Sequence, residues 1–207
     1  MDILIPGAPA TFPIQEENRV LHKYLVWSDH YEQMAVEFMR QYLYGGAYLG
    51  LHLRNGIDWV RACSHIPESP SLFSAPQCLG YKNEEGEATR EMCLPSKDTI
   101  IRQVKQLIKY YNGLGDRNKV VKFVFVASDS NHMLEELASA LRTLDVTVVS
   151  DVRRDPHLDL VILAKSNHFI GNCISSYSSF VKRERDVWKF PTSFWGHTPK
   201  KNLHQEL

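Results

Sequence analysis

The sequence predicts an α/β fold, a parallel β-sheet with helices packed on both of its faces. Two observations carry this prediction. From residue 119 onward, strand and helix patterns alternate three times, which is the element order of a parallel sheet with helical crossovers. The run 120–127 is almost continuously β-branched and aromatic, as expected of a strand buried on both faces. We expect the crossovers between these strands to be right-handed.

The first 44 residues precede this alternation. Residues 1–14 are apolar with three prolines and predict extended chain. Apolar side chains recur at helical spacing over 16–26 and again over 28–44, where two glycines end the pattern. We therefore expect two helices before the first strand, which is the segment AYLGLHL at 47–53.

An irregular segment separates this strand from the next predicted helix. The stretch from Cys63 to Cys93 is rich in proline and glycine and carries an acidic patch at 84–87, so we expect a long loop that buries little of itself. Ser96 is the expected N-cap of the following helix, although Thr99 occupies the place of the Glu or Gln of a capping box. Two glycines end that helix near residue 114.

The remaining elements alternate up to residue 188. Each is short, apolar and bounded by polar or turn-forming residues. They are a helix over 131–142, a strand over 146–149, a helix over 158–164, a strand over 168–170, and a helix from Ser175 or Ser176 to Trp188.

The composition excludes several classes of protein. The 207 residues contain 24 basic and 24 acidic side chains, and this balance gives no electrostatic reason to bind nucleic acid. Apolar residues make up 43% and charged residues 23%, which is ordinary globular usage and argues against disorder. No apolar run approaches the roughly 20 residues of a membrane span. The start has an acid at position 2 and no basic region, so it is not a secretory signal.

The four cysteines bear on the compartment. They contain no CxxC spacing, so we expect no metal site. Two interpretations remain, buried free thiols in a cytosolic domain or disulfides that stabilise the irregular segment by about 3 kcal/mol each. Three pairings are possible, and spacing does not choose among them. The cysteines are Cys63, Cys78, Cys93 and Cys173.

The last four residues, HQEL at 204–207, differ at one position from the HDEL signal for retrieval to the endoplasmic reticulum. Together with the disulfide interpretation, this tail predicts the lumen of the endoplasmic reticulum and binding by the retrieval receptor. No N-x-S/T sequence is present, so glycosylation does not support this prediction.

Polar side chains gather where the predicted strands end. Ligands of open parallel sheets bind at the carboxyl ends of the strands. His52 and Arg54 end the first strand, residues 128–130 end the second, and 171–173 end the last. A guanidinium, hydroxyl groups and the N–H groups of a helix start all suit a phosphate or diphosphate. There is no GxGxxG, no P-loop sequence and no Asp-x-Asp, so Arg54 would supply the countercharge for a diphosphate.

Each of these residues also has a purely structural interpretation. Arg54 would pair with Asp58, His52 would face inward, and Asp129 would cap the helix over 131–142. The segment 175–179 would only cap and pack, and the charged run 182–186 is interpreted as a solvated helix face with a Lys182–Asp186 pair. The tryptophans interpreted as packing residues are Trp59, Trp188 and Trp195.

Several stretches together resemble the protein O-fucosyltransferase 1 family. They lie in the order found in that family and cover essentially the whole chain. They are HLRNGIDW at 52–59, SAPQC at 74–78, MCLPS at 92–96, VFVASDS at 124–130, and HFIGNCISS at 168–176 followed by FVKRERD at 180–186.

The resemblance implies the C-terminal, donor-binding half of a GT-B glycosyltransferase. Residues 45–207 would form a Rossmann-like GDP-fucose-binding domain, and residues 1–44 the linker and helices from the inter-domain region of a missing N-terminal half. The family transfers L-fucose from GDP-fucose, with inversion and without a metal, to Ser or Thr of folded EGF-like repeats such as those of Notch. Because nothing here matches its N-terminal half, the alternative is a non-catalytic module of the endoplasmic reticulum that binds GDP or EGF-repeat clients.

The resemblance also implies roles for particular residues. Arg54 would be catalytic, stabilising the departing β-phosphate, and would face the diphosphate together with His52 and Leu53. Asp159, Ser176 and Tyr177 would match positions that hold the guanine and the phosphates, although the family usually has Phe in place of Tyr177. Ser128 and Asp129 would support the site from beside it, and no residue is assigned as catalytic base. The implied disulfides are Cys63–Cys93 and Cys78–Cys173.

Overall fold

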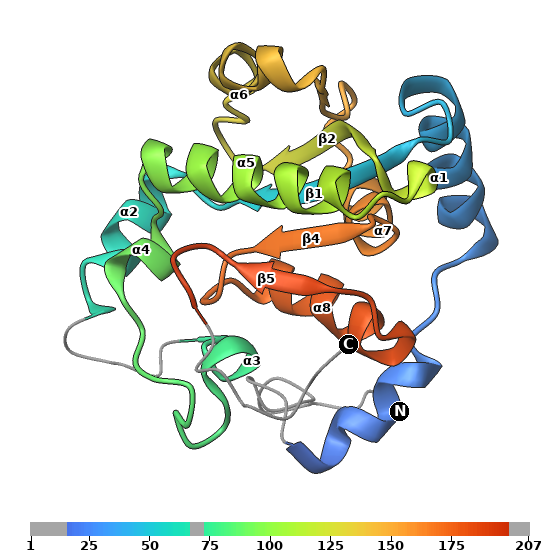
Figure 1. Cartoon of the computed structure of the whole chain (residues 1–207). Helices are drawn as coiled ribbons and strands as arrows, with labels where there is room; N and C mark the ends of the chain where they lie inside the picture. Colours follow the sequence, from blue (N-terminus) through green and yellow to red (C-terminus); the bar gives the residue numbers. More distant parts are fainter. Residues whose placement is uncertain (1–15, 67–72, 199–207) are drawn as a thin grey trace.

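Five parallel strands form a single sheet in this computed structural model, which describes residues 16–66 and 73–198 (Figure 1). The strand order is β3-β2-β1-β4-β5, so the direction of winding reverses between β1 and β4. This confirms the predicted parallel sheet and adds a fifth strand too short to be recognised from sequence. The strands are β1 Ala47–Leu53, β2 Val121–Ser128, β3 Thr147–Val149, β4 His168–Gly171 and β5 Thr192–Phe194.

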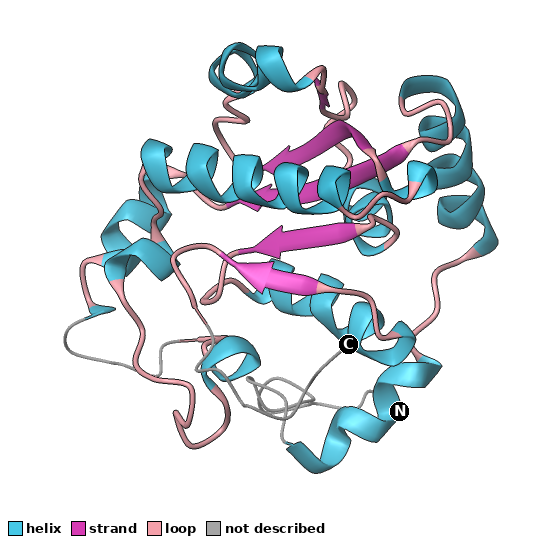
Figure 2. Cartoon of the chain, in the orientation of Figure 1, coloured by secondary structure: helices cyan, strands magenta, loops and turns pink. Residues whose placement is uncertain are grey.

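Helices cover both faces of this sheet (Figure 2). The five longest α-helices were predicted, with the start of α6 three residues later than expected. The first expected helix is a 3-10 helix, and the short helices of the irregular segment were not predicted. The predicted helices are α1 Asp29–Tyr42, α5 Lys97–Gly113, α6 Leu134–Leu141, α7 Pro156–Ala164 and α8 Ser176–Trp188. The others are η1 Glu16–Tyr24, α2 Ile57–Cys63, α3 Pro76–Leu79, α4 Arg90–Cys93, η3 Arg117–Lys119 and η4 Arg142–Leu144.

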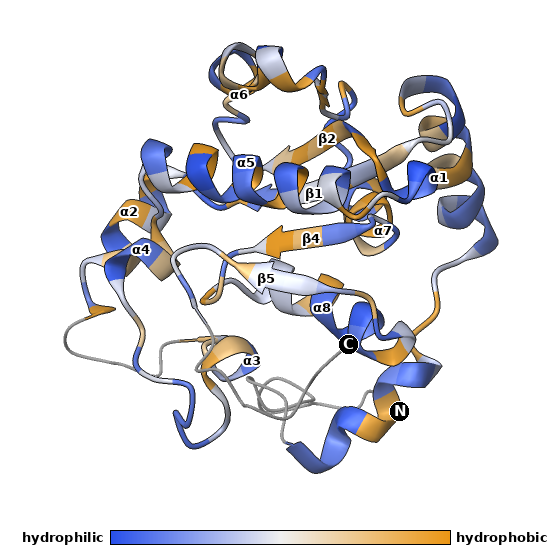
Figure 3. Ribbon diagram, viewed as in Figure 1, coloured by the Kyte–Doolittle hydropathy of each residue, from blue (hydrophilic) through white to orange (hydrophobic). Residues whose placement is uncertain are grey.

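The central strand β1 sends its side chains alternately into two cores. Leu49, Leu51 and Leu53 pack into a cluster with α5 and α6. Tyr48, on the opposite face, packs with α1, α7 and α8. Residues of β2 divide in the same way, which explains its almost unbroken apolar run. Figure 3 shows the matching pattern on α5, where apolar and polar residues alternate around the helix.

Local signals begin two of the helices that flank the sheet. Ser96 caps α5 as predicted, because its hydroxyl accepts a hydrogen bond from the Thr99 N–H at 3.3 Å. Asp155 caps α7 by accepting from the His157 N–H at 2.9 Å, and Pro156 takes the first helical position, where no N–H is needed.

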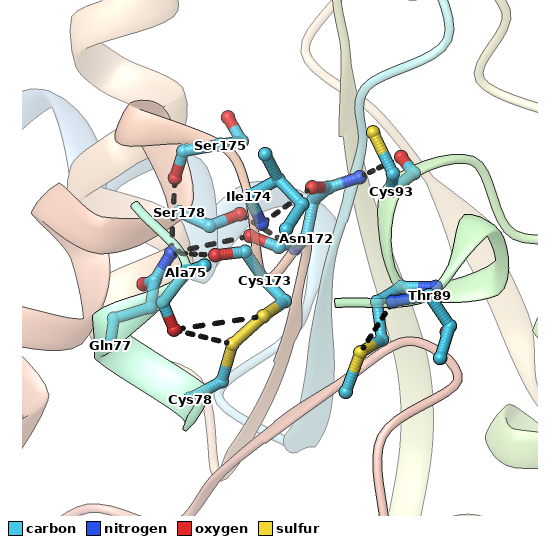
Figure 4. Close-up of a disulfide and its surroundings, with 11 residues drawn as sticks. Ala75, Gln77, Cys78, Thr89, Cys93, Asn172, Cys173, Ile174, Ser175 and Ser178 are labelled. Atoms are coloured by element: carbon cyan, nitrogen blue, oxygen red, sulfur yellow. Dashed lines mark hydrogen bonds between the residues drawn. A yellow bond between two sulfur atoms is a disulfide. The ribbon is translucent and has the colours of Figure 1, made fainter. Parts of the chain in front are cut away.

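Two disulfides organise the segment expected to be a loop with little buried surface. Cys63 bonds to Cys93. Cys78 bonds to Cys173, and Figure 4 shows this second disulfide. This confirms the implied pairing and excludes the free-thiol interpretation. The expectation of little buried surface is wrong, since Ile66, Leu79, Met92 and other apolar side chains form a third cluster around the disulfides.

The charged run 182–186 is only partly the solvated face that was expected. The Lys182 ammonium lies 2.6 Å from a carboxylate oxygen of Asp186, as predicted for residues one turn apart. Arg185, however, is fully buried, because its guanidinium reaches the carbonyl groups at the end of α7. Trp59 and Trp195 are buried packing residues as expected, whereas Trp188 is 65% exposed.

The first two helices, η1 and α1, pack against helices that cover the sheet. η1 contacts α8, and α1 contacts α7 and places Ala35 and Phe38 in a core cluster. Within the described residues, no helix combines the length and apolar character that a bilayer crossing requires. The 204–207 tail lies outside the described residues.

Candidate functional site

A cleft of about 450 Å³ lies at the carboxyl ends of the strands, as the position of ligand sites in open sheets predicts. Larger hollows exist between η1 and α8 and beside the amino end of β1, but neither lies at this edge of the sheet. The residues lining the cleft lie at or after the carboxyl ends of β1, β2 and β3, or belong to the starts of α7 and α8. They are His52, Arg54, Ser128, Asp129, Ser130, His132, Arg154, Pro156, Asp159 and Tyr177.

Arg54 is held between two carboxylates. Its guanidinium lies 2.5 Å from Asp58, one turn further along the chain, and also pairs with Asp129 from the end of β2. The face of Trp59 lies beneath it at 5.0 Å. The predicted pairing with Asp58 is confirmed, and Asp129 is a second partner that the sequence did not indicate. The three charged groups together carry a net charge of −1.

Asp129 does not cap the helix that follows it, so that interpretation is wrong. Its two oxygens accept hydrogen bonds from the Asn55 N–H at 2.8 Å and the Gly56 N–H at 3.0 Å. The reason is the sheet itself, in which the end of β2 is the direct neighbour of the end of β1. A Cβ at Gly56 would collide with the carboxylate of Asp129 and come within 2.8 Å of that of Asp58, so any larger residue here would displace the partners of Arg54.

Ser128 supports the same turn from β2. Its hydroxyl lies 3.1 Å from the Asn55 side-chain oxygen and accepts a hydrogen bond from the Ser130 N–H. Ser128 and Asp129 therefore determine where the chain after β1 runs, and with it the position of Arg54.

His52 faces inward and also lines the cleft. The residue is 3% exposed, its Nδ1 lies 2.7 Å from the Ser178 hydroxyl, and its ring packs on Tyr177 with 4.6 Å between ring centres. Burial, with a smaller contribution from Arg54, lowers the pKa of His52 to about 3. The ring is consequently neutral at physiological pH.

Asp159 and Tyr177 close the other side of the cleft. Burial and the nearby carboxylates of Asp151 and Asp155 raise the pKa of Asp159 to about 8, so its carboxyl group holds a proton at neutral pH. Its Oδ1 has no hydrogen-bond partner within the described part of the chain. The Tyr177 hydroxyl, which the family pattern lacks, donates to the Pro156 carbonyl at 2.6 Å.

Two of the residues implied by the resemblance do not line the cleft. Leu53 points into the core with α5 and is 2% exposed. Ser176 is exposed at the first position of α8. Any contact that Leu53 makes with a ligand would therefore come from its backbone.

Arg154 and His132 line the cleft and were missed by the sequence analysis. Arg154 comes five residues after β3, at the same edge of the sheet but further from its strand end than the residues selected after β1 and β2. It forms no ion pair within the described ranges, whereas the neighbouring Arg153 lies 3.1 Å from Asp151. Burial and Arg154 lower the pKa of His132. No group of three His, Cys, Asp or Glu in the described ranges is placed to hold a metal ion.

Comparison with known proteins decides the family. A sequence model of the GDP-fucose protein O-fucosyltransferase family matches residues 5–188. The chain belongs to this family. It is 37% identical over 182 residues to GDP-fucose protein O-fucosyltransferase 1 of Caenorhabditis elegans, an alignment covering 87% of this chain and 44% of that relative.

Solved structures of the family share the fold. A crystal structure of POFUT1 in complex with GDP superposes with a TM-score of 0.81 at 35% identity, over 91% of this chain and 52% of that one. A POFUT1 complex with GDP-fucose gives 0.79 at 34% identity, over 92% and 52%. These matches confirm the predicted GT-B-type α/β fold, and the family is one of glycosyltransferases. The chain spans about half the length of these relatives.

Proposed function

We propose that the cleft binds the donor GDP-fucose, in the donor-binding half of a protein O-fucosyltransferase. In this proposal residues 45–207 form the binding domain and residues 1–44 come from the inter-domain region. The observation that carries the proposal is the position of Arg54, at the carboxyl end of β1 beside the switch point of the sheet. The similarity to structures solved with GDP and GDP-fucose supports it.

Arg54 would bind the diphosphate by changing partners. Asp58 is 65% exposed and returns to water at little cost, whereas Asp129 is also held by two backbone N–H groups. We therefore expect Arg54 to leave Asp58 for the β-phosphate and to keep Asp129. As the bond to fucose breaks, negative charge grows on the leaving diphosphate, and the guanidinium stabilises it as the catalytic group.

Asp159 and Tyr177 would hold the guanine. The edge of guanine presents adjacent N–H donors, and the carboxyl group of Asp159 can accept two hydrogen bonds from them once it has lost its proton, a loss that such donors favour. The unpartnered Oδ1 of Asp159 supports this assignment. Ser176 would contribute at the start of α8, where helix N–H groups lack internal acceptors, and Leu53 through its backbone.

For the complete reaction, we propose inverting, metal-independent transfer of L-fucose to Ser or Thr of folded EGF-like repeats such as those of Notch. The compartment would be the lumen of the endoplasmic reticulum, with retrieval through residues 204–207. The two disulfides support an oxidising compartment.

The test is an incubation of the chain with GDP-fucose and a folded EGF-like repeat in the presence of EDTA. We expect the mass of the repeat to rise by one fucose and the new bond to have inverted anomeric configuration by NMR. Arg54→Ala should slow the transfer by about a hundredfold or more, the effect of removing one donor to a developing anion. Transfer that survives Arg54→Ala would overturn the role of Arg54.

The second candidate is a non-catalytic module that binds GDP or EGF-repeat clients. In this candidate the cleft holds GDP, and no fucose is transferred. Calorimetry with GDP together with the transfer assay separates the two candidates, since GDP binding without fucose transfer supports the module. Absence of GDP binding would contradict the proposed donor site.

A further inference from the structure

The hydroxyl of Ser178 joins His52 to the backbone beyond β4. Ser178 lies in the first turn of α8 and is fully buried. Its oxygen accepts a hydrogen bond from the Asn172 N–H at 2.8 Å (Figure 4) and lies 2.7 Å from Nδ1 of His52. No other hydrogen-bond partner of this hydroxyl occurs among the residues that the structure describes.

The hydrogens available in these two contacts decide which group donates in each. The backbone N–H of Asn172 can only donate, so the Ser178 oxygen accepts there and its own hydrogen remains available. If His52 also donated from Nδ1, the hydroxyl hydrogen would stay buried without an acceptor, which costs about 1–3 kcal/mol. The arrangement that satisfies every group has Ser178 donating to Nδ1 of His52.

The direction of this bond fixes the tautomer of His52. A neutral imidazole carries one proton, so an Nδ1 that accepts leaves the proton on Nε2. Nδ1 is turned toward α8, and Nε2 is the nitrogen left for the cleft that His52 lines. We propose that Ser178 is a positioning residue that holds His52 as an Nε2–H donor directed at the diphosphate. This inference rests on the proposed donor site.

The opposite tautomer would work against the site. It would present a lone pair to phosphate oxygens, which are themselves acceptors. The burial that lowers the pKa of His52 also removes the doubly protonated form, in which the choice of tautomer would not matter.

The backbone that orients Ser178 is itself held rigidly. The Asn172 side chain donates to the Cys93 carbonyl at 2.6 Å and accepts from the Ile174 N–H at 3.0 Å. The adjacent Cys173 is tied to Cys78, and Gln77 donates to the Cys173 carbonyl at 2.7 Å (Figure 4). The Asn172 N–H is therefore a stationary donor, and it keeps the hydroxyl of Ser178 turned toward His52.

The first test needs no nucleotide. The ¹⁵N chemical shifts of His52 in the complete chain report which ring nitrogen is protonated. We expect a protonated Nε2 and an unprotonated Nδ1 in the unsubstituted chain, and a mixture of tautomers in Ser178→Ala. A proton on Nδ1 in the unsubstituted chain would overturn the inference, whatever the chain binds.

The second test is calorimetry with GDP on a series of variants. Glutamine places its amide nitrogen near the position of Nε2, and asparagine near that of Nδ1. We expect His52→Gln to bind GDP within about threefold of the unsubstituted chain, and His52→Asn and Ser178→Ala to bind about tenfold more weakly. The matched control is Ser179→Ala, the next residue of α8, which should bind GDP unchanged.

The outcomes separate the two proposals. Equal affinity of His52→Gln and His52→Asn, or an unchanged affinity of Ser178→Ala, would overturn the inference while leaving the donor site standing. If the unsubstituted chain binds no GDP, the donor site fails and the role toward the diphosphate fails with it. Thermal unfolding of each variant identifies any weakened binding that comes from a loss of folded protein.

Discussion

Two arginines of this chain hold their charge in opposite surroundings. Arg185, inside the layer of α7 and α8, is fully buried and forms no ion pair within the described residues. Arg54, in the cleft, has a quarter of its side chain exposed and is paired with two carboxylates. The buried arginine therefore lacks a counterion, and the accessible one has more than one.

The two arginines differ in the partner groups that would remain if the guanidinium moved away. Arg185 donates to the carbonyl groups of Ala164 and Ser166 at 2.8 and 2.7 Å, and to that of Pro191 at 2.6 Å. The carbonyls of Ala164 and Ser166 are buried away from water, so this arginine cannot leave them without a cost in free energy. The exposed carboxylate of Asp58 can return to water, so Arg54 can exchange. The comparison separates a structural arginine from one available to a ligand.

The largest expected effect is a loss of stability on substitution of the buried arginine, Arg185. Arg185→Ala would remove the guanidinium donor from the carbonyl oxygens of Ala164 and Ser166 at the end of α7. We expect the free energy of unfolding to fall by more than about 4 kcal/mol in urea denaturation.

The matched control lies on the same helix. Lys182→Ala removes a partly exposed ion pair and should cost less than about 1 kcal/mol. Similar losses in the two variants would show that burial of Arg185 contributes nothing particular to stability.

Asp159 extends the comparison to a buried acid. Arg185 remains charged because carbonyl groups satisfy it, whereas Asp159 Oδ1 has no donor in the described part of the chain. Burial first, then Asp151 and Asp155, raise its pKa from 3.8 to about 8. Between these values the folded chain holds a proton that the unfolded chain has lost. The free energy of unfolding contributed by Asp159 should therefore fall as pH rises, by at most about 1.4 kcal/mol per pH unit.

The measurement is urea unfolding at pH 5, 6.5 and 8, all within or at the edge of that interval, for the unsubstituted chain and Asp159→Asn. Histidines also titrate there, so the difference between the two chains isolates Asp159. We expect this difference to change in favour of Asp159→Asn as pH rises. A difference that stays constant would show that Asp159 is ionised in the folded chain throughout.

Arg154 is a second accessible arginine to set beside Arg54. It lines the cleft and forms no ion pair among the described residues. If free cations bind the phosphates, Arg154→Ala should weaken GDP binding about tenfold, the value of a hydrogen bond to a charged group. Arg153→Ala is the control, because Arg153 is occupied by Asp151 at 3.1 Å. Equal effects of the two substitutions in calorimetry would assign both to long-range charge rather than contact.

Much of the fold was predictable because the sheet is buried on both faces. The apolar run of β2 and the alternation after it determine strands and helices without reference to tertiary contacts. Strand β5 was not predictable, since three residues carry no period. The burial of Arg185 did leave a signal, because it follows Ser178 and Val181 at helical spacing on one face of α8.

The site residues at strand ends could be predicted from the sequence. The contacts that depend on which strands are neighbours in the sheet could not. His52 and Arg54 could be placed by the carboxyl-end rule alone. The partners of Asp129 depend on β1 and β2 being neighbours, which no local pattern contains. Arg154 lies five residues beyond β3, further from its strand end than His52, Arg54 or residues 128–130 lie from theirs, and the strand-end rule does not reach it without the path of the loop.

The most direct test of the account compares GDP with GMP in calorimetry, for the unsubstituted chain and for Arg54→Ala. If Arg54 exchanges a carboxylate for the β-phosphate, the unsubstituted chain should prefer GDP to GMP by about tenfold or more. Arg54→Ala should lose most of this preference and keep its affinity for GMP. A preference for GDP that is equally large in Arg54→Ala would contradict the account.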